Sequence, residues 1–169
     1  MDFSLRKGGY GLDNNTYIHI LTDTLVKKNN LLDELLQITL MQEEYISSTP
    51  PDMDSMENSL TEKGQLIDKI VSLDNGFEKI YEHVKDEIIS QKIKHKDDII
   101  ALQELIKQIT EKSTKLQALE MRNKNKMDII FLKKENEIKE FKKSNKTATS
   151  YYNNMMNIQQ GESYFIDKK

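Results

Sequence analysis

The chain has few residues whose type and spacing could do catalytic chemistry. Its three histidines, His19, His83 and His95, are widely spaced, and none belongs to an HExxH or ExxH pair that would place two metal ligands on one helix face. The segment Gly8–Gly11 lacks the preceding strand and the spacing of a phosphate-binding loop. Adjacent carboxylates such as Asp33-Glu34 do not face one another on a helix, which argues against paired acid–base catalysis. The sequence therefore predicts a protein that is not an enzyme and has neither a cofactor nor a metal site.

The composition indicates the cellular compartment in which the protein is expected. The chain contains no cysteine, so it can form neither disulfides nor thiolate metal sites. No apolar run approaches the roughly 20 residues that span a bilayer, and the N-terminal MDFSLRKGGYGLDNN lacks the apolar stretch of a signal peptide. We therefore expect a cytoplasmic protein that does not insert into a membrane.

Charge is unevenly distributed along the chain. Residues 1–91 carry 8 basic and 17 acidic side chains, a net charge of −9, whereas residues 92–146 carry 15 basic and 9 acidic side chains, a net charge of +6. The two segments would attract one another if the chain folded back antiparallel. The basic run Arg122–Lys126 could contact phosphates instead, but carboxylates are interleaved with the lysines that follow it. A nucleic-acid-binding protein usually has a concentrated basic face, so we favour internal pairing and expect no nucleic-acid partner.

Long helices must position whatever functional residues exist. No glycine or proline lies between Phe77 and Gly161, and apolar residues recur there at helical spacing. The same periodicity reaches back to about Tyr17 and is broken at Pro50-Pro51, because the residue before a proline is disfavoured in helical geometry. We predict an all-α fold, an elongated antiparallel helical hairpin or three-long-helix bundle with coiled-coil-like packing and a flexible aromatic C-terminal tail. The predicted parts are a flexible N-terminus (1–14), a helical domain (15–146) with helices at about 15–48, 52–95 and 98–145, and a flexible tail (147–169). At residues 91–98, where the apolar period lapses, the second and third helices are either separated by a turn or continue as one rod, and we favour the turn.

The second predicted helix shows a heptad pattern that resembles a coiled-coil seam. Its predicted a residues are Met53, Leu60, Ile67, Asp74, Tyr81 and Ile88, and its predicted d residues are Met56, Lys63, Ile70, Phe77, Val84 and Gln91. At 1.5 Å per residue the three helices would be roughly 50, 65 and 70 Å long, so part of the third lacks a partner of matching length. That surplus, together with the aromatic tail, indicates a protein that binds other proteins.

Several segments resemble bacterial flagellar export chaperones of the FlgN/FliT type. These segments are Asn30–Tyr45 (NLLDELLQITLMQEEY), the proline-containing loop after it, Lys63–Tyr81 (KGQLIDKIVSLDNGFEKIY), Leu102–Met127 and Ser163–Lys169 (SYFIDKK). The similarity covers about residues 20–145 and the extreme C-terminus. It implies a small cytoplasmic all-α chaperone that keeps hook-associated proteins, either junction or filament-cap proteins, unassembled and delivers them to the flagellar type III export apparatus.

The resemblance also implies where partners bind, because this family holds the amphipathic C-terminal helix of its client mainly through its own C-terminal helical region. By position, the expected client contacts are Ile129, Ile130, Phe131, Leu132, Ile138 and Phe141. The expected contacts with the export gate are Tyr151, Tyr152, Tyr164 and Phe165. The alternative for the first set is that it belongs to the intramolecular core, and for the second that the tail folds back on the bundle. The alternative function is a structural homodimeric coiled-coil scaffold without a client.

Overall fold

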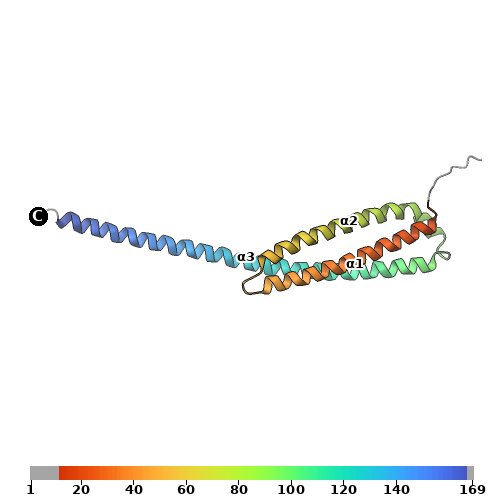
Figure 1. Cartoon of the computed structure of the whole chain (residues 1–169), viewed down its shortest axis with the longest axis horizontal. Coiled ribbons are helices and arrows are strands. Elements are labelled where there is room, and N and C mark those ends of the chain that lie inside the picture. Colours follow the sequence, from red (N-terminus) through yellow and green to blue (C-terminus); the bar gives the residue numbers. More distant parts are fainter. Residues whose placement is uncertain (1–11, 167–169) are drawn as a thin grey trace, which may run out of the picture. The chain divides into compact units, whose positions relative to one another are not determined.

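Three long helices make up the described part of the chain (Figure 1). The computed structural model describes residues 12–166, with side chains described as far as Tyr151 and at Asn153. The helices are α1 (Asn14–Ser47), α2 (Met53–Ser90) and α3 (Lys96–Ile166), and no strand occurs among the described residues. The predicted all-α class is confirmed, whereas most of the predicted flexible N-terminus lies outside the described residues.

The chain divides into two compact units, Met1–Asn123 and Lys124–Lys169. The first unit contains α1, α2 and the part of α3 that ends at Asn123. The second unit contains the remainder of α3.

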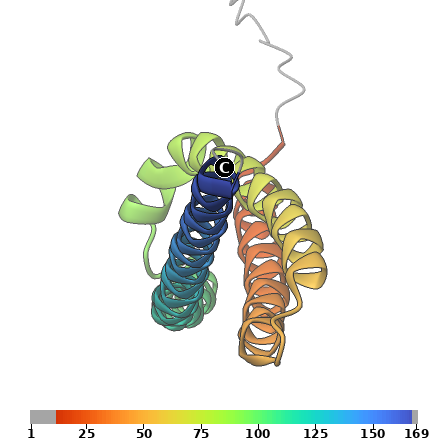
Figure 2. The same ribbon diagram turned by 90° about the vertical axis from the view of Figure 1, so that its left-hand side faces the viewer.

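The ends of the helices follow from capping residues. Asp13 precedes α1 and accepts a hydrogen bond from the Thr16 amide at 2.8 Å. Asp52 precedes α2 and accepts one from the Ser55 amide at 3.0 Å, which lowers the pKa of the Asp52 carboxyl group. Figure 2 shows the short loop before α2 turning the chain from α1 (orange) into α2 (yellow). The proline-containing loop predicted from the sequence is therefore present.

A tight turn at residues 91–95 separates α2 from α3, as predicted. The His95 side chain is 2% exposed and lies in this turn, with its Nε2 atom 3.2 Å from Glu87 Oε1. Asp97 and Asp98 follow in the first turn of α3, where their negative charges interact favourably with the helix dipole. This turn reverses the chain so that α3 can pack against α1 and α2.

In the first unit α1 and α3 run parallel to each other, and α2 runs antiparallel to both. Three contacts between α1 and α3 share the same sequence separation of 79 residues: Asn29–Gln108, Asp33–Lys112 and Glu43–Arg122. A constant separation is expected of parallel helices because both rise equally per residue. The predicted attraction between acidic and basic segments therefore includes a parallel pair of helices, in addition to the antiparallel neighbours.

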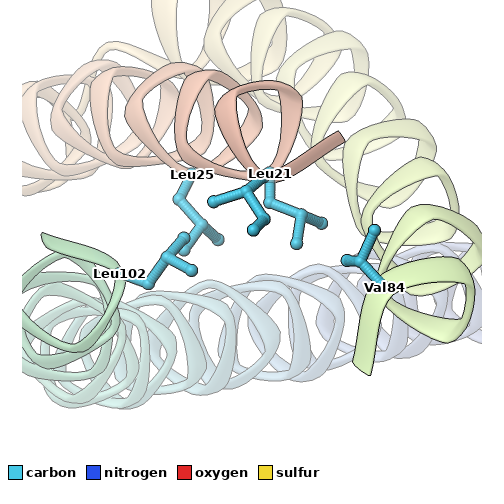
Figure 3. Close-up of a cluster of buried hydrophobic side chains, with 5 residues drawn as sticks. Leu21, Leu25, Val84 and Leu102 are labelled. Atoms are coloured by element: carbon cyan, nitrogen blue, oxygen red, sulfur yellow. The ribbon is translucent and has the colours of Figure 1, made fainter. Parts of the chain in front are cut away.

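The core is built from all three helices in two clusters. The cluster drawn in Figure 3 joins Leu21 and Leu25 of α1 to Val84 of α2 and Leu102 of α3. The second cluster contains Leu32, Leu35, Ile38 and Leu66, with Ile70, Ile109 and Leu116 packed against it. The buried apolar residues of both clusters lie within the first unit.

The structure confirms one of the two predicted rows of the α2 seam and corrects the other. The predicted d row points inward, since Met56, Lys63 and Val84 are buried. The predicted a row is wrong over most of its length, because Leu60, Ile67 and Tyr81 are 54%, 47% and 38% exposed, although Ile88 at its end packs against the core. The true second row lies one position earlier and contains Ser59, Leu66, Leu73 and Ile80. Combined with the row of Met56 and Lys63, either second row gives the alternating three- and four-residue spacing of a heptad pattern, so only the contacts with α1 and α3 decide between them. The true row begins with the polar residue Ser59 and is therefore difficult to recognise in the sequence.

A polar layer replaces the apolar core near the loop between α1 and α2. Lys63 donates to Gln42 Oε1 at 3.0 Å and also pairs with Glu120 of α3. Gln42 in turn donates to Ser59 Oγ at 2.9 Å, and Asn123 donates to the Thr39 carbonyl at 2.8 Å. Burial lowers the pKa of Lys63 to about 8. Hydrogen bonds in this layer therefore connect all three helices immediately before the boundary of the first unit.

Helix α3 continues beyond the end predicted for it at about residue 145. The segment Ser144–Ser150 was expected to break the helix because it is polar, but it contains neither glycine nor proline. Two of its hydroxyl groups bond within the helix, Thr147 to the Lys143 carbonyl and Thr149 to the Asn145 carbonyl, each at 2.9 Å. Such internal bonds satisfy threonine side chains without ending the helix. The flexibility of residues 147–169 stays a prediction.

Candidate functional site

The histidines lie at separate places in the first unit. His19 is exposed on α1. His83 packs edge-on against Tyr17, with ring centroids 5.1 Å apart. The hydrogen bond between buried His95 and Glu87 lowers the pKa of the Glu87 carboxyl group. Among the described side chains, no group of three or more histidines and carboxylates is arranged to hold a metal ion. His83 thus contributes to a contact between α1 and α2, and His95 to a contact between α2 and the turn that follows it.

The second unit presents large apolar side chains to solvent. Five of the six predicted client contacts, Ile129, Phe131, Leu132, Ile138 and Phe141, are between 54% and 71% exposed. The sixth, Ile130, is half-buried. None of the six residues belongs to either core cluster of the first unit. Apolar side chains gathered on an exposed surface are a feature of protein-binding sites.

Helix geometry brings four of the six residues onto one face. Successive residues on an α-helix are about 100° apart, so Phe131 and Ile138 lie within about 20° of each other, as do Ile130 and Phe141. Met127, which is half-buried, falls between these two pairs. We call this face the α3 stripe, and it contains Met127, Ile130, Phe131, Ile138 and Phe141. It is about 100° wide, which is the width that a helix typically buries against a partner.

The other two predicted contacts lie off the α3 stripe. Leu132 is about 100° from Phe131, and Ile129 is about 160° from it. Four consecutive residues cover most of the circumference of a helix, so Ile129–Leu132 cannot all face one partner helix. Met127 was not among the predicted contacts, although it lies three residues before Ile130 and four before Phe131, which is the apolar spacing of a helix face.

The α3 stripe is not a continuation of the bundle seam. In the first unit α3 buries Leu102, Leu119 and Asn123, which follow a heptad pattern. Extending that pattern brings Lys126, Ile130, Lys133 and Glu137 into the seam. These positions are mostly charged, whereas the apolar residues have moved one position along the chain. The residues after Asn123 are therefore not patterned to extend the same core.

The charge of the second unit is positive. Residues 124–151 contain 8 lysines and 4 carboxylates, a net charge of +4. Lys124 pairs with Asp128 at 3.0 Å, and Lys139 pairs with Glu135 at 3.2 Å. Lys134 lies within the α3 stripe, four residues after Ile130 and four before Ile138. The stripe is thus an apolar surface with a lysine at its centre.

The predicted export-gate contacts are only partly described. Tyr151 is 63% exposed and lies on α3 about 110° from the centre of the α3 stripe. The side chains of Tyr152, Tyr164 and Phe165 lie outside the described residues. Whether the four aromatic residues bind a partner or fold back on the bundle stays a prediction.

As far as the structure describes them, none of the three helices combines the length and the apolar character that crossing a bilayer requires.

An all-α chain whose longest helix carries an exposed apolar stripe presents the kind of surface through which all-α proteins bind other proteins by helix faces. A family model described as FlgN protein matches residues 17–157, which include the α3 stripe. The chain therefore belongs to the FlgN family, a family of flagellar export chaperones and not of enzymes. The resemblance seen in the sequence is confirmed. No curated protein and no solved structure matches the chain.

Proposed function

We propose that this protein is a cytoplasmic chaperone of flagellar type III export that binds the C-terminal helix of a hook-associated protein. The client is a junction protein or the filament-cap protein, and the complex keeps it unassembled until delivery to the export apparatus. The observation that carries this proposal is the exposed α3 stripe in a chain of the FlgN family. No catalytic group is needed, because the chaperone acts by covering a surface.

The mechanism is the exchange of one helix partner for another. An amphipathic client helix would otherwise associate with other flagellar subunits, and the α3 stripe offers it equivalent apolar surface. Phe131, Ile138 and Phe141 are 54%, 54% and 71% exposed, so burying the exposed part of all three would stabilise the complex by roughly 3 to 5 kcal/mol. Association costs roughly 4 to 15 kcal/mol in lost freedom, so these three side chains need further contacts beside them and the resulting complex stays reversible. A competing partner can therefore release the client.

The aromatic residues near the C-terminus have a separate role in this proposal. Tyr151, Tyr152, Tyr164 and Phe165 dock to the export gate while the α3 stripe holds the client. The support for this assignment is the exposure of Tyr151 and the sequence position of the other three after the stripe. Tyrosine and phenylalanine side chains are enriched at protein interfaces.

A double substitution tests the client site. Ile130→Asp with Phe141→Asp places two charges on the α3 stripe, and we expect it to abolish co-purification with hook-associated proteins of the same organism. Helicity measured by far-UV circular dichroism should change little, because neither residue belongs to a core cluster. Global unfolding of this variant would show instead that the two residues stabilise the fold.

The matched control is Ile129→Asp with Leu132→Asp. These substitutions add the same charges to the same helix, but on faces away from the α3 stripe. We expect client binding to be retained. Equal loss of binding in both double variants would contradict a single binding face.

A homodimer is the second candidate, and one observation favours it. Leu60, Ile67 and Val71 lie on the outer surface of α2, where they are 54%, 47% and 51% exposed. An apolar row on an exposed helix can pair with a second copy. Analytical ultracentrifugation of the full chain tests this candidate, and a dimer that dissociates on Leu60→Lys with Ile67→Lys would support it.

A further inference from the structure

The lysines of the second unit divide into those with an ion pair and those without. Lys124 and Lys139 are paired with carboxylates four residues away along the same helix. Lys133, Lys134, Lys142 and Lys143 form two adjacent pairs in the sequence, and none of them has an ion pair among the described side chains. Their charges are therefore available to a partner.

Within each adjacent pair, one lysine lies closer to the α3 stripe. Lys134 lies at the centre of the stripe, and Lys142 lies about 70° from that centre. Lys133 and Lys143 lie about 110° and 170° from the centre, so they face away from a helix docked there. Lys134 and Lys142 are eight residues apart, or about 12 Å along the helix.

Carboxylates on the same side only partly balance these two charges. Glu135 lies about 90° from the centre of the stripe and is held by Lys139. Glu137 lies about 70° from the centre, on the opposite edge from Lys142. Covering Lys134 with an apolar helix would remove its charge from water, which is costly unless the partner supplies a carboxylate.

We propose that the helix bound on the α3 stripe is acidic as well as amphipathic, with carboxylates about two helical turns apart beside its apolar face. This inference rests on the proposed function and specifies the chemistry of its client. One carboxylate pairs with Lys134 and the other with Lys142. The apolar contacts supply most of the affinity, and the two lysines select among helices of similar apolar character.

The test uses three synthetic amphipathic peptides with one apolar face in common. Their flanking positions carry glutamate, glutamine or lysine, and binding to the full chain is measured by fluorescence anisotropy at fixed ionic strength. We expect the glutamate peptide to bind about tenfold or more tightly than the lysine peptide, with the glutamine peptide between them. Equal affinity for the glutamate and lysine peptides would overturn the inference.

Charge reversals in the chain show which lysines cause the preference for an acidic peptide. Lys134→Glu with Lys142→Glu should weaken binding of the glutamate peptide about tenfold and strengthen binding of the lysine peptide. Lys133→Glu with Lys143→Glu changes the net charge equally and should alter either affinity about twofold at most. Equal effects of the two double variants would contradict pairing at the stripe and indicate a general effect of net charge.

The outcomes separate this inference from the proposed function. If the peptides bind without a charge preference, and binding is lost in the Ile130→Asp/Phe141→Asp variant, only the acidic character of the client is wrong. If none of the peptides binds, or if binding persists in that variant, both the inference and the proposed binding site are contradicted.

Discussion

Lys63 occupies a heptad position that would ordinarily take an aliphatic residue. Its side chain is 7% exposed, and it reaches across the bundle to Gln42 of α1 and Glu120 of α3. A buried polar side chain of this kind often fixes the register of helices at a cost in stability. Because its partners come from two different helices, a shift of any one helix along the bundle axis would break at least one of the two contacts.

Lys63 gives a prediction about pH. Burial lowers its pKa to about 8 in the folded chain, from the ordinary 10.5. Between these values the unfolded chain binds more protons, so stability should rise with pH, by at most about 1.4 kcal/mol per pH unit. Below pH 8 both states are protonated, and this contribution is constant. Urea unfolding at pH 7.5, 9 and 10 measures the effect.

The control for this measurement is Lys63→Met, which keeps an unbranched side chain and removes the titrating group. We expect the rise in stability between pH 8 and 10 to disappear in this variant. A rise of the same size in Lys63→Met would show that another group causes it.

At the scale of the helices, α2 contains two interior glycines that no contact requires. A Cβ atom added at Gly64 or Gly76 would meet nothing within 4 Å, and neither residue has a positive φ. Alanine is favoured over glycine in a helix interior by about 0.5 to 1 kcal/mol. We therefore expect Gly64→Ala and Gly76→Ala each to raise the free energy of unfolding by that amount, measured by urea denaturation.

The double variant provides a check, because the two sites are 12 residues apart in α2 and share no contact. Their effects should add. A loss of stability in either single variant would mean that the glycine permits a close approach that the structure does not show.

The sequence predicted the three helices and the two connections because each has a local physical signal. Pro50-Pro51 marks one connection, and the lapse of the apolar period before Asp97-Asp98 marks the other. The register of α2 could not be predicted, since Leu60 and Ser59 compete for the same row and only contacts with the other helices decide between them.

The end of α3 could not be predicted for a different reason. A polar segment without glycine or proline permits either a helix or a break, and the hydroxyl bonds of Thr147 and Thr149 form only once the helix is present. For the candidate site, the family resemblance and position along the chain were enough to propose Ile130, Phe131, Ile138 and Phe141, which helix geometry then places on one face. Assigning Ile129 and Leu132 to other faces requires helix geometry.

At the scale of the molecule, folding and binding are assigned to different parts of the chain. Every buried apolar residue among the described side chains lies between Ile18 and Leu119. We therefore expect a chain that ends at Lys126 to keep a cooperative thermal transition within about 4 °C of that of the full chain. The same chain lacks most of the α3 stripe and should not bind a client.

Differential scanning calorimetry measures the first expectation, and co-purification with hook-associated proteins measures the second. A shortened chain that still binds the client would place the binding surface in the first unit. A shortened chain that does not fold would show that the second unit contributes to the core.

Hydrogen–deuterium exchange of the full chain, with and without its hook-associated client, shows whether the α3 stripe is the surface that holds the client. We expect slower exchange in peptides covering residues 127–141 when the client is bound, and no such change with a client that lacks its C-terminal helix. Protection confined to α2, or no protection in residues 127–141 within a stable complex, would contradict the claim that the α3 stripe holds the client.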